Sequence, residues 1–254
     1  MSTVRPVLDF HARLAPRPGA ADDLLSTMDA CGIGRAGVAA GGVVGLDALS
    51  RLLVVGGHVT DDADNDAVLA ACSAAGGRLV PYFFANPHRG IEHYTTRAAE
   101  FRAVEISPAV HGVPLNDSRV HALVEVARVH RHPVYTVCLS RPGAGVADLV
   151  ALARAHREVT FVLGHLGVGL IDTYAVDLVA ASPNVLVETS GAFGFTVRVA
   201  LERLGPDRLL FAAEHPLQHP SVELAKYAAL DLAADTWERI AWHNATRLLG
   251  EDLP

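Results

Sequence analysis

Three short motifs place ionisable side chains at the ends of predicted strands. The segment DFHAR carries Asp9, His11 and Arg13, the segment LGHLG carries His165, and the segment AAEHP carries Glu214. Side chains alternate along a strand, so the three residues of the first motif share one face. Histidine and glutamate commonly move protons in catalysis, and arginine binds carboxylates. The motifs predict acid/base chemistry on a small, carboxylated molecule.

The surrounding sequence predicts the elements that hold these motifs. Short β-branched runs alternate with longer amphipathic stretches, as in βαβ units around a parallel sheet. Eight strands suit a closed (β/α)8 TIM barrel of the α/β class, and 254 residues is close to the usual barrel length of about 250. We expect the strands at Val4–Phe10, Arg35–Ala40, Arg78–Phe84, Ala103–Ile106, Pro133–Leu139, Thr160–Leu163, Val185–Thr189 and Arg208–Ala212.

A closed barrel brings strand eight beside strand one, and its active site forms at the C-terminal ends of the strands. We therefore expect an ion pair between Arg13 and Glu214, with His11 and His165 at the same mouth. A doubly wound open sheet is the alternative architecture, but no GxGxxG motif follows the first strand.

The helices are expected between the strands and at the end of the chain. Asp64, Asp117 and Asp235 stand where N-caps belong. We expect residues 1–254 to form one domain. The segment Gly41–Asp62 fits no barrel element, and we interpret it as an inserted loop that could fold over the barrel mouth. The expected helices are Asp22–Ala30, Asp64–Ala75, Asp117–His130, Val146–His156, Ile171–Ala181, Thr196–Leu204, Val222–Leu230 and Thr236–Leu249.

Composition excludes several functional classes. The net charge is −7 with no basic cluster, which argues against a nucleic-acid partner. The longest uncharged, mostly apolar run, residues 36–46, is shorter than the roughly 18–20 residues of a membrane span. The first residues contain no apolar signal core, so we expect a cytoplasmic protein. Three scattered cysteines, Cys31, Cys72 and Cys138, are interpreted as reduced thiols.

Seven motifs, taken in order, resemble the second amidohydrolase family, the decarboxylase-like branch of that superfamily. The resemblance runs nearly end to end and implies a (β/α)8 barrel with hydrolase or decarboxylase activity on a small molecule. It also implies a divalent metal, often zinc, and dimers are common in the family. The motifs are VLDFHARL, RLVPYFFANP, HPVYTVCL, GHLGVG, NVLVETSG, DRLLFAAEHP and WHNATRLLG.

The resemblance also implies a metal ligand set, and this sequence departs from it. His11 and His165 match the family's histidines on strands one and six, and Glu214 stands at its strand-eight aspartate. However, Arg13 and Val137 stand at two histidine ligands. Valine cannot ligate, and arginine stays protonated. We expect a site with no metal cofactor; the alternative is one zinc held by His11, His165 and Glu214.

The expected catalytic residues are His11, His165 and Glu214. Glu214 is predicted to act as general base toward water, with the histidines orienting or protonating the substrate. Arg13 is predicted to hold a substrate carboxylate or a developing oxyanion. Four further substrate-binding candidates are inward-facing or on loops near the mouth: Glu105, Glu188, His58 and His111.

Two other functions stay open. One is a metal-dependent hydrolase or decarboxylase with the reduced ligand set. The other is a barrel that has lost catalysis and binds a small molecule or a protein partner. Asp9 is interpreted as a support that orients His11, and Cys138 as a small buried residue.

Overall fold

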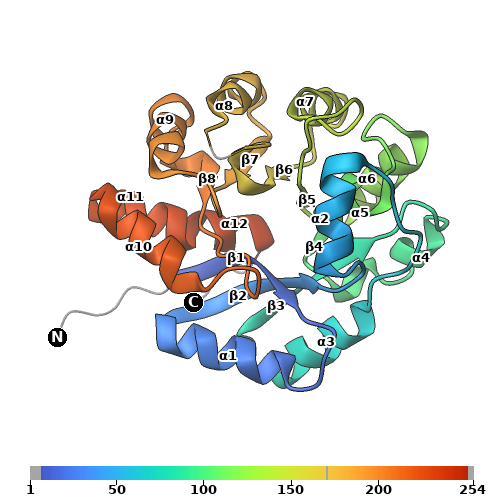
Figure 1. The fold of residues 1–254 in the computed structure, drawn as a ribbon, viewed down its shortest axis with the longest axis horizontal. Helices are drawn as coiled ribbons and strands as arrows, with labels where there is room; N and C mark the ends of the chain where they lie inside the picture. Colours follow the sequence, from blue (N-terminus) through green and yellow to red (C-terminus); the bar gives the residue numbers. More distant parts are fainter. Residues whose placement is uncertain (1–6, 170, 251–254) are drawn as a thin grey trace.

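A computed structural model describes residues 7–169 and 171–250 of the chain. Eight parallel strands run side by side in chain order, and helices form a ring outside them (Figure 1). The predicted barrel class is confirmed. The strands are β1 (Val7–Leu14), β2 (Ile33–Ala40), β3 (Leu79–Ala85), β4 (Ala103–Ile106), β5 (Val134–Thr136), β6 (Phe161–Leu163), β7 (Val185–Glu188) and β8 (Leu209–Leu210).

Hydrogen bonds between β1 and the segment that follows β8 bring the two edges of the sheet together. The amide of Phe10 donates to the carbonyl of Phe211 over 2.8 Å. The amide of Glu214 donates to the carbonyl of His11 over 3.1 Å. Asp9 adds a side-chain link, because its Oδ1 accepts a hydrogen bond from the backbone N–H of Ala213 over 2.9 Å. Glu214 is thereby held next to the first motif.

The helices follow the predicted order, with additions. Among the helices of residues 7–169 and 171–250, none combines the length and the hydropathy of a membrane span. The α-helices are α1 (Ala20–Cys31), α2 (Leu46–Val55), α3 (Asn65–Ala74), α4 (Glu92–Thr95), α5 (Pro108–His111), α6 (Ser118–His130), α7 (Val146–Ala155), α8 (Thr173–Ala180), α9 (Gly194–Leu204), α10 (Pro220–Leu230), α11 (Ala234–Glu238) and α12 (Asn244–Leu249).

Several predicted boundaries shift for physical reasons. The first predicted strand stops at Phe10, but β1 continues to Leu14 because its last residues pair with β2; residues 4–6 of that prediction lie outside the described part. Asp64 and Asp117 cap α3 and α6 as expected. The predicted N-cap at Asp235 is wrong, because α11 begins at Ala234 and Asp235 lies in its first turn.

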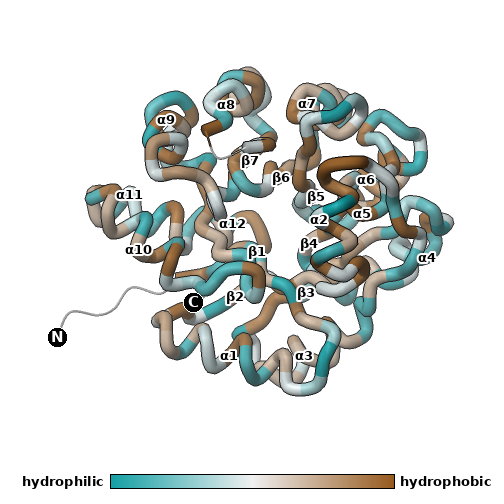
Figure 2. The backbone as a smooth tube through the Cα atoms, viewed as in Figure 1, coloured by the Kyte–Doolittle hydropathy of each residue, from teal (hydrophilic) through white to brown (hydrophobic). Residues whose placement is uncertain are grey.

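Segment 41–62 contains helix α2, which the sequence interpretation had as loop. No residue of α2 is buried, although most of its residues are hydrophobic (Figure 2). It lies within the ring of outer helices in the view of Figure 1. The interpretation of the chain as one domain with an insertion here stays a prediction.

The inside of the barrel below the mouth is filled by large apolar side chains. Leu8, Tyr82, Tyr135, Val162 and Leu210 come from five different strands and belong to one buried cluster. Side chains from strands that are not neighbours can meet only inside a closed sheet. The mouth therefore has an apolar floor, on which the polar residues lie.

Candidate active site

Four ionisable side chains form a closed ring of hydrogen bonds at the mouth. The His11 ring contacts Oε2 of Glu214 through Nδ1 at 2.6 Å and Oε2 of Glu105 through Nε2 at 3.1 Å. Arg13 donates from Nε to Oε1 of Glu214 over 2.9 Å. Its Nη1 and Nη2 donate to the two oxygens of Glu105 over 3.1 and 2.8 Å. The predicted Arg13–Glu214 ion pair is present, and Glu105 makes it a network.

The network holds two positive and two negative charges. Burial alone would lower the pKa of His11, but the Glu214 and Glu105 carboxylates raise it to about 9. Burial alone would raise the pKa of Glu214, yet His11 and Arg13 hold that pKa well below its usual range. The pKa of Glu105 is likewise lowered, against burial, by the charge of Arg13. Only an imidazolium can donate from both ring nitrogens, so His11 is a cation here.

Tyr135 stabilises this imidazolium from below. Its ring stacks on His11 with the centroids 3.9 Å apart and the planes 11° from parallel. The face of an aromatic ring attracts a cation. Burial and the neighbouring Glu188 raise the pKa of Tyr135 well above its usual value, so the tyrosine is neutral.

The surroundings of Glu214 argue against its expected role as a general base. Each of its two oxygens already accepts a hydrogen bond from a cation. A carboxylate with a lowered pKa is a weak proton acceptor at neutral pH. The geometry favours a fixed counterion for His11 and Arg13.

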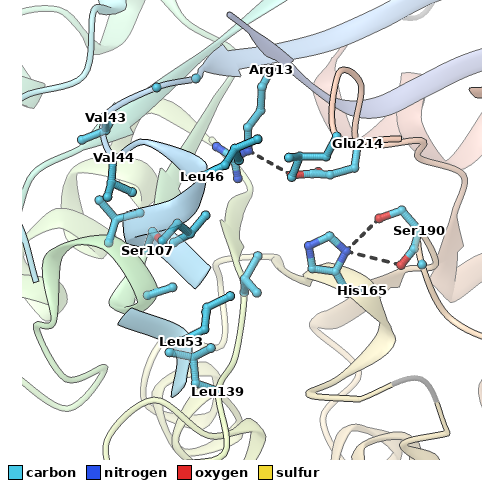
Figure 3. A pocket seen from close by; sticks show the side chains of 18 of the residues that line it. Arg13, Val43, Val44, Leu46, Leu53, Ser107, Leu139, His165, Ser190 and Glu214 are labelled. Atoms are coloured by element: carbon cyan, nitrogen blue, oxygen red, sulfur yellow. Dashed lines mark hydrogen bonds and ion pairs between the residues drawn. The ribbon is translucent and has the colours of Figure 1, made fainter. Parts of the chain in front are cut away.

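His165 is arranged differently from His11. Its Nδ1 lies 2.9 Å from Oγ and 3.3 Å from the carbonyl oxygen of Ser190. The other edge of the ring faces the cavity (Figure 3). A bond from Nδ1–H to this serine leaves Nε2 as the ring's acceptor. His165 is thus arranged to exchange a proton with a molecule in the cavity.

Backbone strain gathers at these residues. His165, Leu166 and Glu214 have φ of 57°, 55° and 56°, in the left-handed region that non-glycine residues avoid. Each such residue costs on the order of 1–3 kcal/mol and persists only where the surroundings impose it. At His165, Oε2 of Glu188 accepts the backbone N–H over 2.9 Å and supports this conformation.

A cavity of about 840 Å³ opens between these polar groups and α2. In Figure 3, Arg13, Glu214, His165 and Ser190 lie on one side, facing the side chains of α2 and the segment before it. The volume is within the usual range for small-molecule sites. Its apolar wall includes Val43, Val44, Leu46, Leu49, Leu53, Val137, Leu139, Val168 and Leu217.

Not all predicted site residues line this cavity. Arg13, His165 and Glu214 do, whereas His11, Glu105 and Glu188 are fully buried behind it. His58 stacks on His88 at the surface, and the buried His111 bonds the backbone carbonyl of Asp61 over 3.2 Å. The structure places neither of these two histidines in the cavity wall.

Sequence reasoning missed Ser190 and the apolar face of α2. Ser190 follows the seventh strand within the motif NVLVETSG, so its place at a strand end was a usable signal. Cys138 lines the cavity but is 2% exposed, and burial raises the pKa of its thiol well above the usual value. It is therefore a neutral thiol and a poor nucleophile.

The residues at the mouth, as arranged, do not fit the divalent metal that the resemblance implies. Every carboxylate oxygen of Glu105 and Glu214 is bonded to Arg13 or His11, and the guanidinium adds a permanent positive charge beside them. His11 has no free nitrogen lone pair as an imidazolium. Across residues 7–169 and 171–250, no group of three His, Cys, Asp or Glu side chains could hold a metal ion.

Comparison with solved structures supports the fold. The 5-carboxyvanillate decarboxylase of Novosphingobium aromaticivorans, with bound manganese, has a TM-score of 0.74 at 16% identity over 97% of both chains. The 2,6-dihydroxybenzoate decarboxylase of Rhizobium has 0.70 at 16% identity, over 97% of this chain and 98% of that one. A candidate 2-pyrone-4,6-dicarboxylic acid hydrolase of Pseudomonas putida has 0.72 at 17% identity over 98% of both.

The sequence comparison extends over almost the whole chain. A search of curated proteins finds no match. The family model described as Amidohydrolase matches residues 9–250, from the first residue of the DFHAR motif to the end of the described part. This range includes all eight strand ends that form the mouth. The chain therefore belongs to the amidohydrolase family.

Proposed function

We propose that this chain is a hydrolase or lyase that acts on a small, carboxylated molecule in the cavity at the barrel mouth. In this proposal His165 transfers the proton and the site works without a resident metal. The observation that carries it is the orientation of His165, whose Nδ1 is held by Ser190 while its other edge faces the cavity.

Both reaction types need one proton-transfer group on the cavity wall. In a decarboxylation the bond to the carboxylate carbon breaks, its electron pair stays on the remaining carbon, and that carbon takes up a proton as carbon dioxide leaves. In a hydrolysis, water gives up a proton as its oxygen bonds to a carbonyl carbon; the bond from that carbon to the leaving group then breaks, and the leaving group takes up a proton. Histidine is the side chain that most often makes such transfers.

Arg13 supplies the positive charge that a carboxylated substrate needs. A guanidinium has five N–H groups, and the network bonds use three of them. The side chain is 19% exposed and lines the cavity. Its remaining N–H groups are available to a substrate carboxylate or oxyanion, while Glu105 and Glu214 fix its position.

The apolar wall indicates that the part of the substrate away from its carboxylate is apolar. Leu46 and Leu53 of α2 face the polar side across the cavity, and Leu49 of the same helix also lines it. The structural neighbours act on 5-carboxyvanillate and 2,6-dihydroxybenzoate, which are carboxylated aromatic molecules. A carboxylated ring would place its acid against Arg13 and its apolar face against α2.

A metal-dependent hydrolase or decarboxylase is the second candidate function, because one neighbour contains manganese. In that case His11, His165 and Glu214 would be the ligands, and the Arg13 network would have to open. A barrel without catalytic activity that acts as a binding protein is the third interpretation.

The test is a turnover panel with chelator-treated protein. Aromatic carboxylic acids and pyrone dicarboxylic acids are incubated with the protein, and mass spectrometry distinguishes loss of carbon dioxide from gain of water. We expect turnover without metal that is lost in His165→Asn, by a factor on the order of 10²–10⁴. Turnover only after manganese or zinc is added would favour the second candidate. Binding of these acids with no turnover under either condition would favour the third.

A further inference from the structure

We propose that Glu188 is a positioning residue that sets the direction of the His165 ring through the backbone of two loops. The proposal rests on the proton-transfer role given to His165 above. Glu188 is the last residue of β7, whereas His165 follows β6 and Ser190 follows β7. One carboxylate thus stands between the two partners of the bond that orients the ring.

The contacts of Glu188 join those two partners directly. Its Oε2 accepts the backbone N–H of His165 over 2.9 Å, and its Oε1 accepts the backbone N–H of Ser190 over 2.7 Å. Bonds to an ionised acceptor are about twice as strong as neutral ones. Because the same side chain holds both backbones, it fixes the separation between the His165 ring and the serine that orients it.

The chemical type at this position matters as well as its volume. Glutamine would keep one acceptor oxygen but turn an NH₂ group toward the other backbone N–H, so two donors would face each other. His165 and Leu166 both have left-handed backbones, which persist only with outside support. Losing either acceptor would let the loop relax and turn the ring away from Ser190.

Glu188 does not bind substrate in this arrangement. Its exposed fraction is 0%, and it is absent from the cavity wall. Tyr135 approaches Oε2 as well, at 3.4 Å. The earlier interpretation of Glu188 as a substrate-binding candidate is therefore replaced by an indirect role, exerted on His165 and Ser190.

The primary experiment is nitrogen-15 NMR of the histidine rings in the wild type and in Glu188→Gln, with His165→Asn to assign the signal. In the wild type we expect one tautomer at His165, protonated at Nδ1 whenever the ring is neutral. In Glu188→Gln we expect a mixture of the two tautomers. Turnover should fall about 10- to 100-fold, the usual effect of losing a group that orients an active residue, with KM changed less than about twofold.

Glu223 provides the matched control. It is a carboxylate at 2% exposure whose Oε1 accepts the backbone N–H of Gly191 over 2.9 Å, one residue after Ser190. It makes no direct contact with His165 in the described part of the chain. Its other oxygen pairs with Lys226, so Glu223→Gln removes a buried charge that supports the same loop, and the His165 signal should keep its wild-type tautomer.

The outcomes separate this proposal from the proposed function. Wild-type His165 signals in Glu188→Gln would overturn the positioning role, even if turnover fell. Equal disturbance in Glu223→Gln would also overturn it, because any loosening of the loop would then suffice. If Glu188→Gln does not fold, Glu188→Asp keeps the charge at shorter reach and should give a smaller disturbance. Full activity of His165→Asn would refute the proposed function, while the ring spectra would still test Glu188.

Discussion

The two histidines at the mouth show how one residue type takes different states in two regions of one site. His11 lies between two carboxylates and over a tyrosine ring, is fully buried, and has a pKa of about 9. His165 has a serine on one side and the cavity on the other. Both nitrogens of His11 are committed, so it cannot exchange a proton without breaking the network.

This difference suggests a division of roles between the two sides of the mouth. The β1 side, with His11, Arg13, Glu105 and Glu214, resembles a fixed ionic structure in which each charge is compensated. The β6–β7 side holds one histidine, whose ring contacts an uncharged serine on one edge and faces the cavity with the other. We therefore expect changes on the first side to affect folding most, and changes on the second to affect turnover most.

The largest expected effect is on folding stability. Arg13→Met would leave two buried carboxylates with one imidazolium, and breaking a buried ion pair from one side typically costs about 3–5 kcal/mol. His165→Asn removes no buried charge partner and should cost less than about 1 kcal/mol. Urea denaturation of both variants, followed by circular dichroism, gives the two free energies of unfolding.

Arg13→Lys is the matched control for that comparison. It keeps the positive charge but lacks the planar guanidinium that reaches both carboxylates. Its free energy of unfolding should therefore lie between those of Arg13→Met and the wild type. Equal losses in Arg13→Met and His165→Asn would remove the proposed distinction between the two sides.

The next effect is a dependence of stability on pH. The folded pKa of His11, about 9, exceeds the 6.5 of an unperturbed histidine, so the network's contribution to stability is complete below about pH 6.5 and is lost as pH rises through 9. Burial raises the pKa of Asp9 to about 8, which acts in the same direction. We expect the free energy of unfolding to fall by about 1–3 kcal/mol between pH 6.5 and 9.

Asp9→Asn separates the two contributions. It removes the titration of the aspartate and keeps a side chain of the same shape. The dependence of the free energy of unfolding on pH that remains is therefore due to His11. A free energy of unfolding that stays level over this pH interval in Asp9→Asn would mean that His11 is neutral in the folded protein.

A smaller effect is expected at Ser190. Ser190→Ala removes the hydroxyl 2.9 Å from Nδ1 but keeps the backbone carbonyl at 3.3 Å. The loss of one hydrogen bond is worth about 1 kcal/mol, so turnover should fall by roughly fivefold to tenfold. Steady-state kinetics with the substrate found in the panel measures it, and Ser221→Ala, outside the cavity wall, is the comparison. Unchanged turnover would show that the serine does not orient the ring.

The smallest expected effect is that of added metal on the wild type. Manganese or zinc should change the melting temperature by less than about 1 °C, because a ligand that does not bind the folded state does not stabilise it. Arg13→His removes the guanidinium and should gain manganese affinity, measurable by calorimetry. Strong manganese binding by the wild type would contradict the fixed network and favour the metal-dependent function.

The sequence by itself determined the barrel and one ion pair at its mouth. The alternation of β-branched runs with amphipathic stretches gave eight strands in order, because strand and helix periodicities are local properties. The strand-end positions of His11, Arg13 and Glu214 then predicted the Arg13–Glu214 pair, because a closed barrel places its last strand beside its first.

Only the tertiary structure decided how these charges are shared. The second carboxylate of the network, Glu105, comes from β4, and nothing local in the sequence distinguishes a substrate ligand there from a counterion. The burial and mutual distances of the four groups make His11 a cation and lower the pKa of Glu214, which argues against the expected role of Glu214 as general base. The same holds for Glu188 and Ser190, whose importance arises from contacts between two loops that meet only after the barrel has closed.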